Sequence, residues 1–317
     1  MTLCDTTLLT KMAQLDLPVP VYNWLVDFFQ GHTHRTTFNG EESSTTSISA
    51  SIIQGSGIGP AAYSVTAADL KTIHSGNSLI KFADDTYLVI PSANASTRQQ
   101  EIGHIATWAA TNNLKLNVLK TKQIVFENSR RRADTPQPPP PPLPDIAREK
   151  ELKILGVTIT RHLSASEHVR HVISDGAQSL YALRVLRHHG LCEAGLHTVY
   201  RAIVVSRLMY ASPAWSGFTT AEDRQRVEAF LRRSKRCGFC PPDLPDFDEL
   251  LEDADDQLFQ RILNNPHHTL HQLLPPQSTA SQHYQLRHRT HDRQLPAHKG
   301  YLSDCNFITR MLYKNSY

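Results

Sequence analysis

The sequence predicts an α+β fold in which a strand-containing N-terminal half precedes an all-helical C-terminal half. Up to residue 159, short runs rich in Val, Ile, Thr and Phe alternate with segments of helical periodicity. Beyond residue 163, apolar residues recur at helical spacing and the strand signals end. Of the 317 residues, 40% are apolar and 20% are charged. That is enough apolar material to bury a core, so a wholly disordered chain is excluded.

Composition also excludes membrane-spanning and disulfide-rich classes. The chain has no apolar run of about 18 residues, and its best short candidate, Val21 to Phe29, carries Asp27. No basic segment followed by an apolar core begins the sequence, so no secretory signal is visible. The five cysteines are odd in number and scattered, which suits a reducing compartment. We expect an intracellular chain without a membrane anchor, in the nucleus or the cytoplasm, of unknown oligomeric state.

The net charge of +3 conceals a pattern along the chain. Residues 71–132 contain nine basic and four acidic side chains, and residues 171–240 contain ten basic and five acidic ones. Between Asp243 and Asp256 there are eight acids and no base. Two basic stretches followed by an acidic one suggest a polyanionic partner at particular faces. Solvated helix surfaces are the alternative explanation of the same pattern.

The first third of the chain predicts helices, a hairpin and a turn-rich loop. Two short helices are expected between Thr6 and Gln30, interrupted by Pro18-Val-Pro20. The dipeptide Asn39-Gly40 between extended segments indicates a β-hairpin. The glycine-rich segment Gln54-Gly-Ser-Gly-Ile-Gly-Pro60 then predicts a loop, and a helix should follow it.

The sharpest chemical signal is the acid pair Asp84-Asp85. It separates the apolar runs Ser78–Ala83 and Thr86–Ile90, which predict a hairpin of buried strands with the acids at its tip. Two carboxylates held together beside buried strands are costly without a cation. Mg²⁺ takes hard oxygen ligands and keeps positions for water and phosphate, which suits phosphoryl transfer. Asp84 is the first candidate ligand, Asp85 the second; an ordinary solvent-exposed Asp-Asp turn is the alternative.

The second half contains a proline-rich segment and then helices. Residues 130–144 hold three arginines followed by a run of prolines, which predicts an exposed loop or, alternatively, a ligand for SH3-type domains. A strand is expected at Leu152–Ile159. Helix caps are expected at Ser164 and at Thr219 with Glu222. Short helices and loops should follow residue 240.

Four blocks in fixed order resemble reverse transcriptases, with the character of non-long-terminal-repeat (LINE-like) retrotransposons. Phe82-Ala-Asp-Asp85 resembles their catalytic hairpin, and Gln54 to Pro60 resembles the loop that precedes it. Leu114-Lys-Leu-Asn117 with Lys120-Thr121 resembles the next block, and Leu152-Lys-Ile-Leu-Gly156 resembles the strand that grips the primer. The order and spacing of all four blocks agree, which is far more specific than any single motif.

The resemblance implies a partial right-hand polymerase palm, a mixed or antiparallel sheet with helices, followed by an all-helical thumb and a C-terminal tail. We expect the palm at residues 1–163, including the proline-rich loop 130–144. The thumb is expected at residues 164–240, where Tyr210 to Trp215 looks like that group. The helical tail is expected at residues 241–317.

The resemblance also implies roles for individual residues in RNA-directed DNA synthesis. The implied partners are an RNA template, a DNA primer and deoxynucleoside triphosphates, and the implied cofactor is Mg²⁺ or Mn²⁺. Basic thumb residues such as Arg184, Arg187, Arg201, Arg224 and Arg233 would touch the duplex backbone. The implied site residues are Asp84 and Asp85 for metal and catalysis, Lys120 near the triphosphate, Gln54, Gly55, Ser56, Phe82 and Ala83 for nucleotide and template, and Leu155 and Gly156 for the primer end.

One departure from the family pattern bears on activity. The family's first metal-binding carboxylate typically lies in Phe-Asp-x-x-x-His-x-x-Leu-Leu. Aligning Leu8-Leu9 with the end of that pattern puts Met1 at its Asp and Asp5 at its His. We therefore expect a truncated chain without that carboxylate and without the fingers, inactive or nearly so. The alternatives are a non-catalytic nucleic-acid-binding remnant and a Mg²⁺-dependent nuclease or phosphohydrolase.

Two weaker signals remain. Cys237-Gly-Phe-Cys240 has the spacing of a zinc knuckle, but no second cysteine pair follows, so surface cysteines are favoured over a zinc site. Asp255-Asp256 lacks flanking strands and is assigned to an acidic helix surface.

Overall fold

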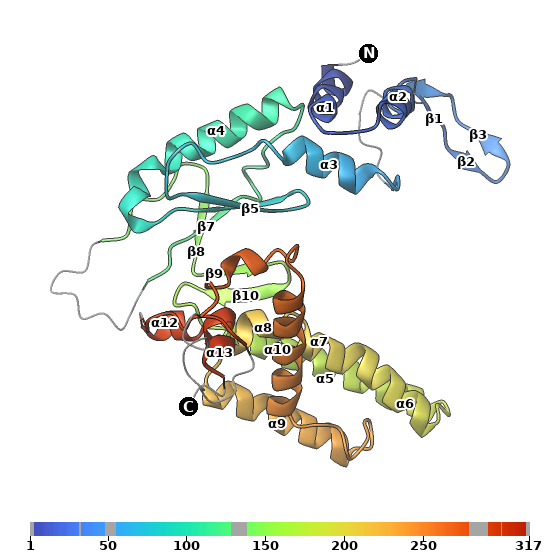
Figure 1. Cartoon of the computed structure of the whole chain (residues 1–317). Helices are drawn as coiled ribbons and strands as arrows, with labels where there is room; N and C mark the ends of the chain where they lie inside the picture. The colour runs from blue at the N-terminus through green and yellow to red at the C-terminus, as the bar shows by residue number, and fades with distance from the viewer. Residues whose placement is uncertain are drawn as a thin grey trace. The chain divides into compact units, whose positions relative to one another are not determined.

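The computed structural model describes residues 3–31, 33–47, 55–127, 138–278, 291–298 and 300–314. The chain folds into two compact units (Figure 1). The first unit comprises residues 1–121 with 138–147, and the second comprises residues 122–137 with 148–317. Gln54 and residues 130–137 of the proline-rich segment lie outside the described residues. The proposed boundaries at residues 163 and 240 remain predictions.

The first unit combines helices with short antiparallel hairpins, which agrees with the predicted α+β class. Pro20 occupies the first turn of α2, where its missing N–H leaves no helical bond unmade. Asn39 and Gly40 have φ angles of 51° and 85° and join β2 to β3, as their sequence predicts. The helices are α1 (Leu3–Ala13), α2 (Val19–Phe28), α3 (Gly59–Ala67), η1 (Ser92–Thr97) and α4 (Arg98–Thr111). The paired strands are β1 (Thr33–His34) with β4 (Thr46–Ser47), β2 (Thr37–Phe38) with β3 (Glu41–Glu42), and β5 (Ser78–Phe82) with β6 (Asp85–Val89).

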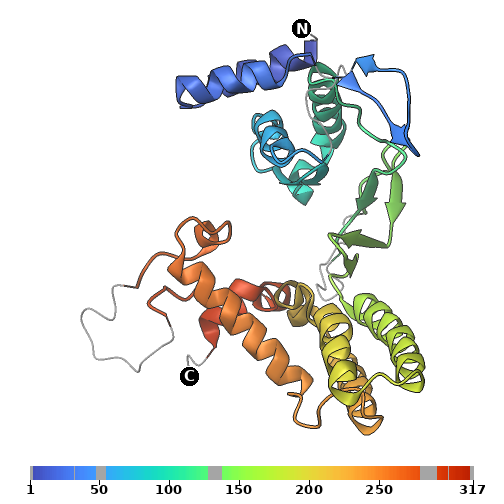
Figure 2. The same ribbon diagram turned by 90° about the vertical axis from the view of Figure 1, so that its right-hand side faces the viewer.

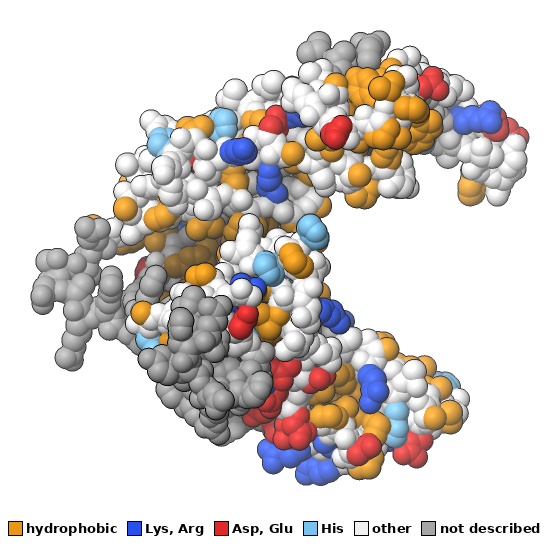
Figure 3. Space-filling view, viewed as in Figure 1, with side chains coloured by type: hydrophobic (Ala, Val, Ile, Leu, Met, Phe, Trp, Pro, Cys, Tyr) orange, Lys and Arg blue, Asp and Glu red, His pale blue; other side chains and the backbone are white. Residues whose placement is uncertain are grey.

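The apolar core of the first unit is small. It lies where α1, α2 and α3 meet and is built from Leu8, Leu9, Met12, Leu25, Phe29 and Ala62. On its outer face, α2 leaves Val19 and Trp24 exposed, and hydrophobic side chains gather over this helix in Figure 3. The unit therefore covers only part of its apolar surface, and other contacts must contribute to its cohesion.

The second unit is mainly helical and begins with two short antiparallel sheets. The predicted strand at Leu152–Ile159 is a hairpin of two strands, β9 and β10. The paired strands are β7 (Lys122–Ile124) with β8 (Ala147–Glu149), and β9 (Glu151–Ile154) with β10 (Val157–Thr160). The helices are α5 (Ser166–His188), α6 (Glu193–Tyr200), the π-helix η2 (Arg201–Val205), α7 (Ser206–Met209), α8 (Ser212–Trp215), η3 (Ser216–Phe218), α9 (Ala221–Arg236), α10 (Phe247–Asn264), η4 (His271–Leu273), α12 (Tyr301–Asp304) and α13 (Phe307–Tyr313).

A continuous apolar core joins the helices of the second unit. Tyr200, Trp215, Phe230 and Phe247 are each at most 2% exposed and belong to one cluster. Helix α5 packs against α6 and α9, as both views show (Figures 1 and 2). No described helix combines the length and the apolarity that a membrane span needs.

Helix α10 corrects one prediction for the region after residue 240. It runs for 18 residues rather than forming a short helix, and it packs on α8 and α9. The cause is its pattern of buried residues, Phe247, Leu251, Phe259 and Ile262, which recurs at helical spacing among the acids. The acidic composition of this stretch concealed a core-forming helix.

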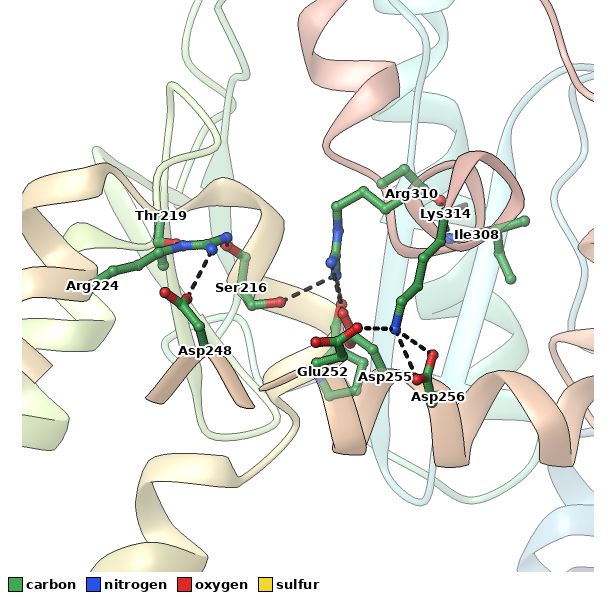
Figure 4. A network of polar contacts seen from close by, with 12 residues as sticks. Ser216, Thr219, Arg224, Asp248, Glu252, Asp255, Asp256, Ile308, Arg310 and Lys314 are labelled. Carbon is green, nitrogen blue, oxygen red and sulfur yellow. Dashed lines mark hydrogen bonds and ion pairs between the residues drawn. The ribbon is translucent and has the colours of Figure 1, made fainter. Parts of the chain in front are cut away.

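Ion pairs tie the C-terminal helix α13 to α10 (Figure 4). The Arg310 guanidinium contacts the carboxylate of Asp255 at 2.7 Å, and Lys314 contacts Asp256 at 2.8 Å and Glu252 at 2.7 Å. Asp255 is 5% exposed. It is a buried partner of an arginine, so its assignment to a solvated acidic surface was wrong.

Candidate active site

The acid pair lies at the end of the hairpin formed by β5 and β6. The two strands pair from Ser78 with Val89 to Phe82 with Asp85, so the connecting loop is Ala83-Asp84. Ala83 has a φ of 49°, a left-handed conformation that a two-residue hairpin loop favours. The predicted hairpin is thus present, with Asp84 in its loop and Asp85 as the first residue of β6.

The hairpin is not buried, contrary to expectation. None of its strand residues is buried, and Ile80 and Phe82 are 58% and 62% exposed. Asp84 and Asp85 are also exposed. Because water can solvate both carboxylates, their proximity does not by itself demand a cation. A metal role for this pair therefore depends on the chemistry of the ligands and on the surrounding elements.

Electrostatics connect the hairpin tip to the helix that follows the glycine-rich segment. Gly55, with a φ of 87°, begins the described part of this segment, and α3 starts four residues later at Gly59. Burial and, second, the negative charge of Asp84 raise the pKa of Tyr63 on α3. Asp84 therefore lies near enough to α3 for its charge to act on Tyr63, in the helix that follows the glycine-rich segment.

Lys120 is placed less directly. It lies in the turn after α4, it is exposed, and its backbone N–H donates to Oδ1 of Asn117 at 3.2 Å. Within the described residues, no hydrogen bond or ion pair joins Lys120 to Asp84 or Asp85. Its role near a triphosphate remains a prediction, as do those of Ser56, Phe82 and Ala83.

A lysine on β5 ties the hairpin to α3. The Lys81 ammonium donates to the carbonyl oxygens of Ala67 at 2.6 Å and Leu70 at 3.1 Å. Ala67 is the last residue of α3 and Leu70 follows it by three residues, so the ammonium lies at the C-terminal end of this helix, where positive charge is favourable. Burial holds the pKa of Lys81 below its ordinary value. Lys81 thus links the strand that precedes the acid pair to the helix that follows the glycine-rich segment.

A second lysine joins three helices at the same place. The Lys11 ammonium, on α1, donates to the carbonyl of Thr66, to Oδ1 of Asp69 and to Oδ1 of Asn112 at 2.6–2.9 Å. The Trp108 indole N–H donates to the same Asp69 oxygen at 3.0 Å. Burial raises the pKa of Asp69, but these two donors outweigh it and leave the pKa below its ordinary value. We call Lys11, Lys81 and Asp69, with their partners, the polar hub.

A buried carboxylate holds the turn that leads into β5. Glu101 on α4 is fully buried and accepts hydrogen bonds from the backbone N–H groups of Ile73 and His74 and from the Asn77 amide. Burial raises its pKa, but these hydrogen bonds outweigh burial and lower the pKa to about 2. Glu101 is therefore ionised and fixes residues 73–77, directly before the hairpin. Glu101 and the polar hub were not predicted, although an isolated Lys81 inside an apolar strand was a usable signal.

In the second unit, Leu155 and Gly156 form the two-residue turn between β9 and β10. Both have left-handed φ angles, 45° and 89°, and both are exposed. The turn borders a groove of about 1000 Å³ whose lining includes Gly156, His168 and Tyr210. Burial lowers the pKa of His168, and its Nδ1 accepts the backbone N–H of Thr158 at 3.4 Å. The predicted primer-end residues thus stand at the edge of a concave surface.

Several of the predicted duplex-binding arginines make contacts within the second unit. Arg224 pairs with Asp248 at 3.1 Å, and Arg187 donates to the Cys237 carbonyl and lies over the Phe239 ring. These contacts hold the guanidinium groups at defined places on exposed helix ends. Whether nucleic acid contacts them remains a prediction.

The described residues contain no group of three His, Cys, Asp or Glu side chains arranged to hold a metal ion. The acid pair therefore offers two carboxylates to a cation. Cys237 is exposed, whereas Cys240 is buried and burial raises the pKa of its thiol. A buried thiol with a raised pKa is a poor source of the thiolate that zinc requires.

Known proteins resemble this chain over the same region. Residues 6–159 match the model of the family described as reverse transcriptase (RNA-dependent DNA polymerase). The chain is 25% identical over 235 residues to the probable RNA-directed DNA polymerase from transposon X-element of Drosophila melanogaster, covering 69% of this chain and 25% of that protein. It is 30% identical over 178 residues to the RNA-directed DNA polymerase from mobile element jockey of the same species, covering 52% of this chain and 19% of that protein.

A third relative, the probable RNA-directed DNA polymerase from transposon BS of Drosophila melanogaster, is 25% identical over 246 residues, which cover 72% of this chain and 26% of that protein. The chain thus spans about a quarter, or less, of the length of these relatives. The matched family region contains the glycine-rich segment, the acid pair and the Leu155–Gly156 turn. Residues 6–159 are therefore similar to reverse transcriptases, and the relatives named here are RNA-directed DNA polymerases of a mobile element and of transposons.

Proposed function

We propose that this chain acts in RNA-directed DNA synthesis, with an RNA template and a DNA primer as its partners and deoxynucleoside triphosphates as substrates. The observation that carries the proposal is the hairpin tip, where two adjacent carboxylates stand exposed and Asp84 acts electrostatically on α3. An exposed pair at a loop can approach a nucleotide, which a pair buried between strands could not do. We assign the hairpin to a polymerase palm and the helices after residue 163 to a thumb.

The acid pair supplies the type of ligand atom that a divalent cation needs. Carboxylate oxygens are the hard ligands that Mg²⁺ and Mn²⁺ prefer, and Mg²⁺ commonly takes one or two of them and fills its other positions with water and phosphate oxygens. When bound, such an ion lowers the pKa of an attacking hydroxyl and stabilises the phosphoryl-transfer transition state. The protein's own contribution is to hold Asp84 and Asp85 at one tip, with the hairpin anchored to α3 by Lys81.

A second candidate function is nucleic-acid binding without synthesis. The small number of acidic ligands favours this function. In the part of the chain that the structure describes, no third acidic side chain joins Asp84 and Asp85. Two carboxylates hold a cation more weakly than three. If this second candidate holds, the 317-residue chain on its own binds an RNA–DNA hybrid and extends a primer slowly or not at all.

Primer extension on an RNA template, with Mg²⁺ and separately with Mn²⁺, tests the proposal. Extension that is lost in Asp84→Ala and kept in Asp16→Ala, an exposed acid in the turn after α1, supports polymerase activity. Hybrid binding without extension in the wild type supports the second candidate. Strand cleavage that depends on Asp84 contradicts both and favours a nuclease.

Mn²⁺ binding provides a readout that does not need catalysis. Titration of the wild type, Asp84→Ala, Asp85→Ala and Asp16→Ala with Mn²⁺, followed by the paramagnetic broadening of nearby resonances, locates the ion. We expect broadening at the hairpin tip that both hairpin variants weaken and Asp16→Ala does not. Broadening centred elsewhere would contradict the assignment of the acid pair.

A further inference from the structure

The Leu155–Gly156 turn has a conformation that its sequence alone does not stabilise. Both residues have positive φ, which suits Gly156 and is uncommon for a leucine. The turn is also exposed, so no apolar burial compensates for the conformation of Leu155. Some contact from outside the hairpin must therefore hold it.

That contact is made by Tyr210, which follows α7. Its hydroxyl donates a hydrogen bond to the carbonyl oxygen of Leu155 at 3.0 Å. Its ring lies so close to Gly156 that a Cβ atom there would be 3.1 Å from Cε1. Glycine is thus favoured at position 156 for two separate reasons, its φ of 89° and the nearby ring. One tyrosine side chain contacts both residues of the turn.

Tyr210 is itself fixed from the core of the second unit. The indole N–H of Trp215, a residue only 2% exposed, donates to the Tyr210 carbonyl at 2.9 Å. Ala211 has a left-handed φ of 50° and bends the chain between the two aromatic residues. The Arg310 guanidinium in turn donates to the Pro213 carbonyl at 3.3 Å. A chain of contacts therefore runs from the buried C-terminal helix to the exposed turn.

We propose that Tyr210 is a positioning residue that fixes the Leu155–Gly156 turn and, through it, the wall of the neighbouring groove. Gly156 and Tyr210 both line this groove of about 1000 Å³, so a change in the turn changes its wall. The proposal rests on the proposed function and, within it, on the primer-end role that the family resemblance predicts for Leu155 and Gly156. Tyr210 acts through the turn and is not itself assigned to the chemistry.

Hydrogen exchange of the peptide that spans the turn tests whether Tyr210 fixes it. Tyr210→Phe removes only the hydroxyl, and Tyr210→Ala removes the ring as well. We expect exchange at residues 155–157 to rise about two- to tenfold in Tyr210→Phe, as for the loss of one hydrogen bond, and further in Tyr210→Ala. Tyr181, 68% exposed on α5, provides the matched control Tyr181→Phe, which should leave the turn unchanged. Unchanged exchange in Tyr210→Ala would overturn the proposal.

The close contact at Gly156 gives an independent test. Gly156→Ala should lower the melting temperature through both the backbone strain and the clash with the Tyr210 ring. In the Tyr210→Ala background only the strain remains, so the same substitution should lower the melting temperature less. Equal losses in the two backgrounds would overturn the contact that the proposal requires.

Binding of hybrids with different ends separates a positioning role from a merely structural one. The wild type should prefer an RNA–DNA hybrid with a recessed DNA 3′ end over a blunt hybrid. Tyr210→Phe should reduce this preference while its melting temperature stays close to that of the wild type. A wild type without the preference overturns the primer role of the turn. A preference that Tyr210→Phe leaves intact overturns the positioning role alone.

Discussion

The two units of the molecule are stabilised by different kinds of interaction. Among the described residues of the first unit, six buried apolar residues form the main cluster. Lys11 joins its helices, Lys81 joins the hairpin to α3, and Glu101 holds the turn before the hairpin. Among the described residues of the second unit, eighteen buried residues form one continuous cluster across most of its helices. Apolar burial is non-directional, so one lost contact matters little. A hydrogen bond is lost when its specific partner is removed or, for an ionisable group, when the protonation state changes.

This difference predicts different sensitivities. The first unit should respond to pH and to single polar substitutions, because few apolar contacts replace a lost hydrogen bond. The second unit should tolerate loss of surface ion pairs, since exposed pairs contribute little. Its exception is the Asp255–Arg310 pair, because the carboxylate of Asp255 is buried.

The largest expected effect is in the second unit. Arg310→Met leaves Asp255 buried without its cation, so the free energy of unfolding of this unit should fall by about 3–5 kcal/mol. Chemical denaturation followed by tryptophan fluorescence of Trp215 measures it. Arg236→Met, at an exposed arginine of α9, should change it little. Replacing Asp255 together with Arg310 should recover part of the lost free energy of unfolding. If nothing is recovered, the arginine stabilises the unit by contacts other than its pair with Asp255.

The next effect tests the pH sensitivity of the first unit. The pKa of Glu101 is about 2 in the folded chain and 4.5 as its unperturbed value, which corresponds to about 3 kcal/mol of stabilisation near neutral pH. The unfolded chain takes up the proton first as pH falls. The stabilisation is therefore complete above pH 4.5 and is lost as pH falls towards about 2.

Glu101→Gln should remove most of the stabilisation that the Glu101 carboxylate gives at neutral pH. It should also flatten the pH dependence of the stability between pH 4.5 and about 2. Hydrogen exchange of residues 73–77 as a function of pH measures both. Glu42→Gln, at an exposed acid of the same unit, should leave the dependence as it is. A Glu101→Gln variant with the wild-type profile would show that another group controls the acid response.

A smaller loss is expected from the lysine of the hairpin. Lys81→Met removes the donor to Ala67 and Leu70 and leaves two carbonyls without it, which should cost about 1–3 kcal/mol. Exchange at the amides of β5 and β6 should rise more than exchange at α1, because the link between hairpin and α3 is broken. The exposed Lys71→Met is the matched control. Equal changes along the whole unit would contradict a specific anchor.

The smallest effect concerns the electrostatic link from the hairpin tip to α3. Burial is the larger cause of the raised Tyr63 pKa and the Asp84 charge the second, so Asp84→Asn should lower that pKa only part of the way towards its ordinary value. A pH titration of labelled tyrosine resonances, assigned with Tyr63→Phe, measures it. Asp85→Asn should have the weaker effect. A Tyr63 pKa that does not respond to Asp84→Asn would separate the hairpin tip from α3.

Local signals in the sequence were informative because they depend on short-range chemistry. Asn39-Gly40 forms the predicted two-residue turn, and Asp84 lies in the predicted hairpin loop, whereas the single strand predicted at Leu152–Ile159 is interrupted by a turn at Leu155-Gly156. Helix caps were located less well: the capping box of α9 uses Thr220 with Asp223, one residue after the predicted Thr219 with Glu222. Neighbouring Thr residues offer the same side chain, and only the packing of α9 selects between them.

The sequence by itself determined the family resemblance, the α+β class and the acid pair at a hairpin, because motifs and turns depend on adjacent residues. Only the tertiary structure decided that this hairpin is exposed, that Lys11, Lys81 and Glu101 anchor its surroundings, and that Tyr210 reaches a turn 55 residues earlier. Each of these depends on partners far apart in the chain. Their contribution is set by burial and distance, which the order of residues does not reveal.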